Sequence, residues 1–154
     1  MSHKTRVTDH FAFVYTKRPQ SYNATPKRKY VYKNDLSATY QKSFTGKIMS
    51  KELYAIVYYF YKVDLKLDAD NISKPTWDAL NNVGYTDDNQ IKTRVAITID
   101  LSKYDMIDID QDNLPAEVAD ELMQSLADND HTVYIEVGAI KNNSNIFNIS
   151  QLWK

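Results

Sequence analysis

The stretch DADNISKPTWDALNNVGYTDD, residues 68–88, decides the fold because it contains a clear helical pattern bounded by acidic residues. Small and apolar residues recur there with a helical period, at Ile72, Thr76, Ala79, Leu80 and Val83. This stripe predicts a helix over residues 70–83 that packs one face against a core. Gly84 stands where a glycine in the left-handed conformation often ends a helix. The acids at both ends repel one another, so something else has to make their clustering tolerable.

Segments with the pattern of strands lie on both sides of this helix. LYAIVYYFYKV, residues 53–63, is apolar on both alternating faces, which predicts a central strand covered on both sides. KTRVAITID, residues 92–100, has β-branched residues alternating along one face and predicts the next strand. HFAFVYTK at residues 10–17 and HTVYIEVGAI at residues 131–140 predict two more strands.

Two further helices are predicted, and with them the fold class. Asn34 or Asp35 can cap a helix that runs to about residue 44, and Pro115 opens an amphipathic helix that runs to about residue 127. The acidic segment 101–112 either extends the preceding strand or forms a loop. Strands that alternate with helices predict an α/β, mixed α+β fold with about four strands in a mixed sheet and about three helices.

The chain is expected to form a single domain over residues 1–154, with a flexible N-terminus (1–8) and an Asn-rich tail (141–154). Its composition is 43% hydrophobic, enough for one core. No run is apolar and long enough to span a bilayer, so no membrane partner is predicted. The sequence has no cysteine, which excludes disulfides and cysteine-based zinc sites and fits a cytoplasmic protein. No fingerprint for an organic cofactor occurs.

Charge is unevenly distributed along the chain. Residues 1–60 carry eleven Lys/Arg and three Asp/Glu, a net charge of +8, whereas residues 61–154 carry eight and seventeen, a net charge of −9. Five of the cations lie in and around the loop predicted after the first strand: Lys17, Arg18, Lys27, Arg28 and Lys29. A face that follows the phosphates of nucleic acid explains this split, and mutual neutralisation of the two halves explains it equally well.

The first two acids of the helical stretch have the spacing of metal ligands. Asp68 and Asp70 are two residues apart, so in an extended segment both carboxylates point to the same face. Two carboxylates on one face need a cation to neutralise them, and hard oxygen ligands suit Mg²⁺ or Mn²⁺. Asn71 can serve as the helix cap, which leaves Asp70 free to bind the cation. Acids at helix ends also commonly do no more than cap the helix and keep it soluble.

Lys74 follows one turn after Asp70, on the face opposite the apolar stripe and beside Trp77. Its amine either contacts a phosphate held at the acidic site or forms an exposed pair with Asp78. Pro75 fits best in the first turn of a helix, which moves the predicted helix start to Asn71 or later. Asp87 and Asp88 open the next strand.

If that strand pairs beside residues 53–63, its entry is expected to return to the first two acids. A third carboxylate, that of Asp88, would then join Asp68 and Asp70 at one site.

These residues resemble the core motif of the RusA-type Holliday junction resolvases, a family of crossover junction endodeoxyribonucleases. The motif reads D-x-D-N-x-x-K, followed by a D-A-L helix, a glycine and a paired D-D that opens a strand, and residues 68–91 contain each of these elements. RPQSYNA at residues 18–24 is similar to the family's P-x-S-x-N stretch, and HTVYIEVGAI is similar to its closing strand.

The resemblance implies a homodimeric, Mg²⁺-dependent endonuclease that cuts four-way DNA junctions by phosphodiester hydrolysis. Family members are often encoded by phages and prophages, so the bacterial host cytoplasm is the implied place of action. The matched catalytic residues are Asp68, Asp70, Lys74 and Asp88, the three aspartates are the matched metal ligands, and Asn71 matches the motif asparagine on the DNA-facing side. A non-catalytic DNA-binding protein and a phage interaction protein on the same fold are the alternatives.

Overall fold

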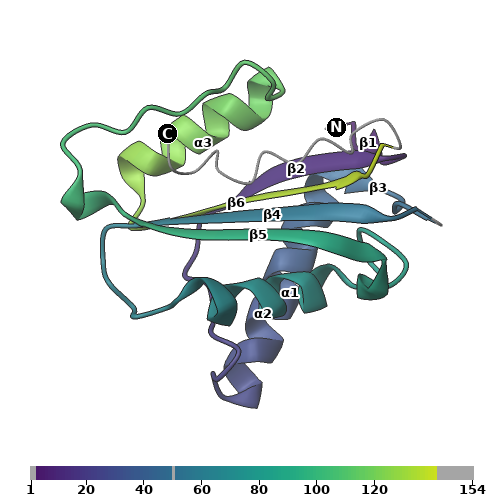
Figure 1. Cartoon of the computed structure of the whole chain (residues 1–154), viewed down its shortest axis with the longest axis horizontal. Coiled ribbons are helices and arrows are strands. Elements are labelled where there is room, and N and C mark those ends of the chain that lie inside the picture. The colour runs from purple at the N-terminus through teal and green to yellow at the C-terminus, as the bar shows by residue number, and fades with distance from the viewer. Residues whose placement is uncertain (1–2, 50, 142–154) are drawn as a thin grey trace.

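The computed structural model describes residues 3–49 and 51–141, and its centre is a four-stranded mixed sheet in the order β2-β6-β4-β5 (Figure 1). The strands are β2 (His10–Tyr15), β4 (Leu53–Tyr61), β5 (Ile91–Asp100) and β6 (His131–Ala139). β6 pairs antiparallel with both β2 and β4, whereas β4 and β5 run parallel. The predicted mixed sheet is confirmed, and each strand ends within about two residues of its predicted bounds.

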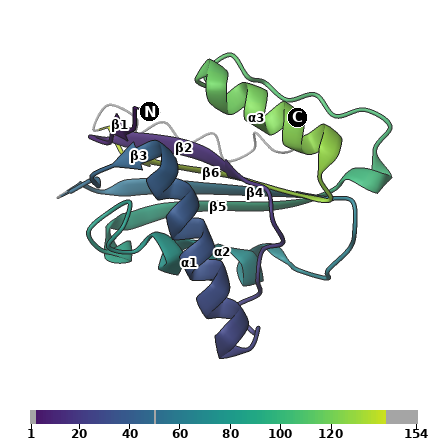
Figure 2. The same cartoon turned by 180° about the vertical axis from the view of Figure 1, so that it is seen from behind.

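Helices cover both faces of this sheet. The helices are α1 (Pro26–Ser43), α2 (Ala69–Leu80) and α3 (Ala116–Asp128). Figures 1 and 2 show α1 and α2 together on one face and α3 on the other. The predicted mixed α+β fold with three helices is therefore confirmed.

Short elements complete the described chain. They are the 3₁₀ turns η1 (Asp88–Gln90) and η2 (Leu101–Lys103) and a small parallel sheet of β1 (Thr5–Arg6) and β3 (Phe44–Thr45). Val7, next to β1, is buried in the core, so part of the N-terminal segment 1–8 packs on the body. Segment 101–112 forms η2 and then a loop. Most of the Asn-rich tail, residues 142–154, lies outside the described residues.

Helix α1 begins earlier than predicted. Thr25 is its N-cap and accepts a hydrogen bond from the Arg28 amide at 3.4 Å, and Pro26 occupies the first helical position. Proline fits that position because the first amides of a helix have no partner within the helix. The prediction of a start at Asn34 or Asp35 is therefore wrong, and residues 27–29 form the first turn of a helix instead of a loop.

The main core lies between the sheet and the α1–α2 pair. Its largest fully buried side chains include Trp77, Tyr32, Tyr40, Tyr59 and Tyr85. The Tyr32 hydroxyl lies 3.0 Å from Thr76 Oγ1, which itself donates to the Ile72 carbonyl at 2.8 Å. Because a threonine hydroxyl has one hydrogen, Tyr32 is the donor to Thr76. This buried chain of hydrogen bonds joins α1 to α2.

The other face of the sheet is less completely covered, because α3 packs on β2 and β6. On β4, Leu53, Ala55 and Val57 are fully buried toward α1 and α2, whereas the alternate residues on the α3 side, Tyr54, Ile56 and Tyr58, are half-buried. The prediction that β4 is covered on both sides is therefore confirmed for the face toward α1 and α2. The face toward α3 is only partly covered. Within the described part of the chain, no helix has the length and apolar character needed to cross a membrane.

Gly84 has a different role from the one predicted. Helix α2 ends at Leu80, and Asn82, with φ of 60°, takes the left-handed conformation that was expected of the glycine. Gly84 is needed for space, because a Cβ atom there would lie 2.8 Å from Cζ of the buried Phe11 ring. The predicted helix end at residue 83 is wrong because the chain turns away at Asn81.

Replacing Gly84 with alanine should therefore destabilise the protein by overpacking. We expect Gly84→Ala to lower the free energy of unfolding by about 1–3 kcal/mol, measured by urea denaturation. In a Phe11→Leu background, where the ring is absent, the same substitution should be less destabilising. A wild-type unfolding midpoint for Gly84→Ala would contradict this role.

Candidate active site

Asp68, not Asn71, caps helix α2. Asp68 is extended, and its Oδ1 accepts a hydrogen bond from the Asn71 amide at 2.8 Å. Asp70 lies inside the first helical turn, where the positive end of the helix dipole favours a carboxylate. The expectation that Asp68 and Asp70 share one face of an extended segment is therefore wrong, although both side chains are exposed at the start of the helix.

Pro75 lies inside α2 instead of in its first turn, and the loop before α1 makes this possible. A proline has no N–H, so the Asn71 carbonyl lacks its usual helical donor. The Tyr22 amide donates to that carbonyl at 2.9 Å, and the Asn23 side-chain amide lies 3.5 Å from Asn71 Oδ1. The prediction that Pro75 moves the helix start to Asn71 or later is therefore wrong, because a distant segment supplies the missing hydrogen bond.

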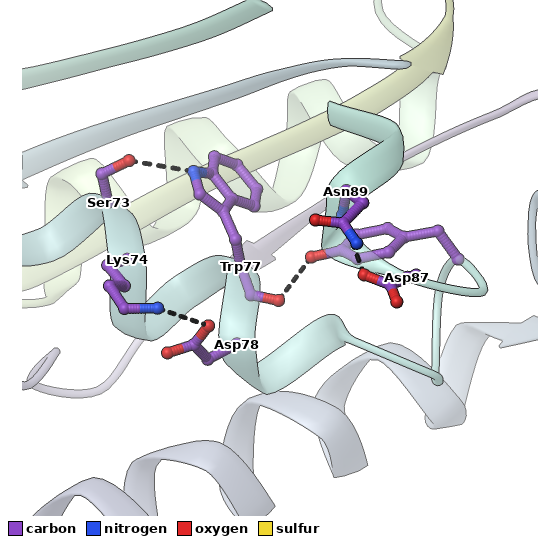
Figure 3. A network of polar contacts seen from close by, with 7 residues as sticks. Ser73, Lys74, Trp77, Asp78, Asp87 and Asn89 are labelled. Carbon is purple, nitrogen blue, oxygen red and sulfur yellow. Dashed lines mark hydrogen bonds and ion pairs between the residues drawn. The ribbon is translucent and has the colours of Figure 1, made fainter. Parts of the chain in front are cut away.

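Trp77 fixes how α2 is rotated against the sheet. Its ring is fully buried, whereas the sequence had placed it beside Lys74 on the exposed side. The indole N–H donates to Ser73 Oγ at 2.9 Å, and the Trp77 carbonyl accepts from the Tyr85 hydroxyl. Figure 3 shows Trp77 between Ser73 and the turn that carries Asp87 and Asn89. The same side chain therefore orients the helix and anchors the following turn.

Lys74 and Asp78 form an ion pair on the exposed side of α2, with 3.2 Å between Nζ and Oδ1 (Figure 3). The two side chains are 49% and 44% exposed, so the pair stabilises the fold by at most a few tenths of a kcal/mol. The Lys74 ammonium also lies 5.9 Å from the centre of the Tyr22 ring. An ion pair that stabilises the fold so little leaves the Lys74 ammonium free to bind another anion in place of Asp78.

Asp87 and Asp88 lie at the other end of α2 from Asp68. Asp87 caps η1, and its own amide donates to the Gln90 side chain at 3.0 Å. β5 then starts beside Leu53, the first residue of β4, because the two strands are parallel. The connecting helix has 12 residues and spans about 18 Å, so its two ends lie far apart. The expectation that this turn returns to Asp68 and Asp70 is therefore wrong.

Asp78 in α2 and Asp87 and Asp88 in the following turn instead act electrostatically on the Tyr85 side chain. Burial raises the pKa of Tyr85 well above its ordinary value, and these carboxylates, Asp88 first, raise it further against the opposing charge of Arg94. Among residues 3–49 and 51–141, no group of three or more histidine and acidic side chains is arranged to hold a metal ion. One chain therefore supplies carboxylates of the right chemistry at both ends of α2 but does not unite Asp68, Asp70 and Asp88.

The predicted DNA-binding cations lie in two places: Lys17 and Arg18 follow β2, and Lys27, Arg28 and Lys29 are in the first turn of α1. Lys17, Arg18, Lys27 and Arg28 line a depression of about 580 Å³, where Lys17 also pairs with Asp35 at 3.0 Å. Lys29 lies outside this depression, with its Nζ 5.3 Å from the centre of the Tyr22 ring.

Tyr22 therefore connects the two parts of the candidate site, because Lys29 of α1 and Lys74 of α2 both approach its ring. Tyr22 was not among the site residues predicted from the sequence. The signal that could have identified it is its position inside the SYN segment, between two residues that commonly form turns.

An acid-capped helix with an exposed lysine, next to a basic helix start, is suited to a protein that acts on the phosphates of nucleic acid. The sequence matches a family model described as Endodeoxyribonuclease RusA over residues 10–107, from β2 to the loop after η2. The chain belongs to this family of endodeoxyribonucleases, as its motif indicated. The matched range ends before α3 and β6, so the similarity of HTVYIEVGAI lies outside it. No curated protein matches the sequence.

The cap of α2 can be tested separately from any role in catalysis. Asparagine caps helices about as well as aspartate, whereas alanine cannot. We expect Asp68→Ala to lose about 1 kcal/mol of unfolding free energy and Asp68→Asn to lose little, measured by urea denaturation without added metal. Equal midpoints for the two variants would show that the carboxylate does not hold the first turn.

Proposed function

We propose that the protein is a metal-dependent, structure-selective endonuclease that resolves four-way DNA junctions by phosphodiester hydrolysis. The observation that carries this proposal is the family match over residues 10–107, which contains the whole D-x-D-N-x-x-K motif. The juxtaposition of α2 with the basic start of α1 supports it. On the basis of the family alone, we also propose a phage or prophage origin and action in a bacterial cytoplasm.

The separation of the acids along α2 supports a site that is shared between two chains. In a two-fold homodimer whose α2 helices run antiparallel across the axis, the start of one helix lies beside the end of the other. The partner subunit's Asp88 would then join Asp68 and Asp70. Carboxylate oxygens are the ligands that Mg²⁺ and Mn²⁺ prefer. A bound ion would supply a water of lowered pKa and neutralise charge on the phosphate.

The other residues of the site would bind and orient the DNA. Lys74 is proposed to leave Asp78 and donate to the phosphate as its negative charge increases. Asn71, whose main chain is held by Tyr22 and by the Asp68 cap, would present its side-chain amide next to the phosphate backbone. The basic residues follow the backbone without reading sequence: Lys17, Arg18, Lys27, Arg28 and Lys29.

A shared site predicts a specific complementation result. Asp68→Asn and Asp88→Asn homodimers should each bind a four-way junction in EDTA and fail to cut it when Mg²⁺ is added. A heterodimer of the two variants, co-expressed with different affinity tags, should regain cleavage. One of its sites would carry both substitutions, and the other would be intact. We therefore expect nicking of one strand per junction, measured on end-labelled DNA.

Other outcomes separate the alternatives. An inactive heterodimer that still binds junctions would place each site within one chain. Wild-type protein that binds junctions but never cuts them with Mg²⁺ or Mn²⁺ would be a non-catalytic DNA-binding protein. Wild-type protein that does not bind branched DNA would favour the phage interaction protein.

Lys74→Arg tests the proposed role of the lysine. Arginine keeps the charge and can still pair with Asp78, but its planar donors cannot take the position of a single ammonium. We expect normal junction binding and a fall in single-turnover cleavage of roughly a hundredfold or more. The unfolding midpoint should not change, because the exposed pair contributes little. A wild-type cleavage rate would reduce Lys74 to a surface partner of Asp78.

A further inference from the structure

Tyr22 combines a fixed backbone with an exposed ring. Its amide is held by the Asn71 carbonyl at 2.9 Å, and the next residue is tied back by Ser21 Oγ at 3.0 Å. The side chain is nevertheless 47% exposed, whereas the neighbouring core tyrosines Tyr15 and Tyr32 are 3% and 1% exposed. The ring of Tyr22 is therefore accessible to a ligand at the surface.

Two cations approach this ring from different helices. Lys29 Nζ and Lys74 Nζ lie 5.3 Å and 5.9 Å from its centre, within the range of cation–π attraction. The arrangement places two ammonium groups that can contact phosphates next to one exposed aromatic ring. Proteins that bind unpaired nucleic acid use this combination, because bases stack on the ring while the backbone contacts the cations.

We propose that Tyr22 stacks on an unstacked base at the branch point of the DNA junction and so distinguishes branched DNA from continuous duplex. This inference rests on the proposed function and names a residue that determines its specificity. In a continuous duplex each base is already stacked on both faces, so the ring has no base to contact. At a branch point stacking is interrupted, and a free base face becomes available beside Lys74. Tyr22 is fixed relative to α2 by its main chain and therefore holds that base in register with the acidic site.

The test uses binding in EDTA, so that it does not depend on cleavage. Junctions and duplexes of the same sequence would carry 2-aminopurine at the branch-point nucleotide, because its fluorescence falls when it stacks on an aromatic ring. We expect Tyr22→Leu to abolish the quenching and to reduce the ratio of junction affinity to duplex affinity by about tenfold or more. Tyr22→Phe keeps the ring and should preserve both.

Tyr104→Leu is the matched control. Tyr104 is 57% exposed, lies after η2 and lines a depression with Tyr58 and Ile97 on the α3 side of the sheet. This variant should behave as wild type in both measurements. Neither substitution should affect folding, because both rings are exposed and the Tyr22 amide remains available to Asn71.

Each outcome supports or overturns a defined statement. Wild-type junction preference that is unchanged in Tyr22→Leu overturns the stacking proposal alone. An equal loss of junction and duplex affinity also overturns it, because it shows that Tyr22 only supports the basic surface. A wild-type protein without any junction preference overturns the proposed function, and the stacking proposal with it.

Discussion

The burial of Trp77 is the constraint on which the geometry of the site depends. Because the indole is enclosed between α2 and the sheet, the helix has one permitted rotation, and that rotation leaves Lys74 and Asp78 at the surface. The Trp77 carbonyl also receives the Tyr85 hydroxyl, which anchors the turn before β5. A large apolar side chain that belongs to the core therefore sets the positions of polar groups on both sides of it.

The parallel pairing of β4 and β5 explains why the acids are divided. A parallel crossover has to return along the full length of the first strand, and α2 makes this return. Residues just before the helix and residues just after it are consequently held at opposite ends of the sheet. A two-fold axis between two chains would bring these residues together, because in an antiparallel pair of α2 helices the start of one helix lies beside the end of the other. In the proposed homodimer, the composition of the site would therefore depend on the oligomeric state.

Features that depend on local pattern were predictable from the sequence, and features that depend on distant partners were not. The continuous apolar run of residues 53–63 and the stripe from Ile72 to Val83 identified a strand and a helix. Burial of both faces of a strand leaves an apolar run, and burial of one face of a helix imposes a period on the sequence. The helix cap was misassigned because aspartate and asparagine serve equally well at that position. Pro75 was misplaced because its effect is compensated by Tyr22, and no local rule identifies such a partner. The direction of strand pairing, which decided where Asp88 lies, is a tertiary property that periodicity does not contain.

The proline within α2 makes the helix dependent on a second segment for its completion. If residue 75 were not a proline, its amide would donate to the Asn71 carbonyl. The loop before α1 would then have no free acceptor at that position. Because of Pro75, the Asn71 carbonyl accepts from the Tyr22 amide instead. The loop and the first turns of α2 therefore become ordered together. Local opening of one segment breaks the hydrogen bond between the Tyr22 amide and the Asn71 carbonyl, so the other segment loses part of its support. We therefore expect the two segments to gain and lose order together, so that displacement of the loop would also disturb the helix that carries the motif.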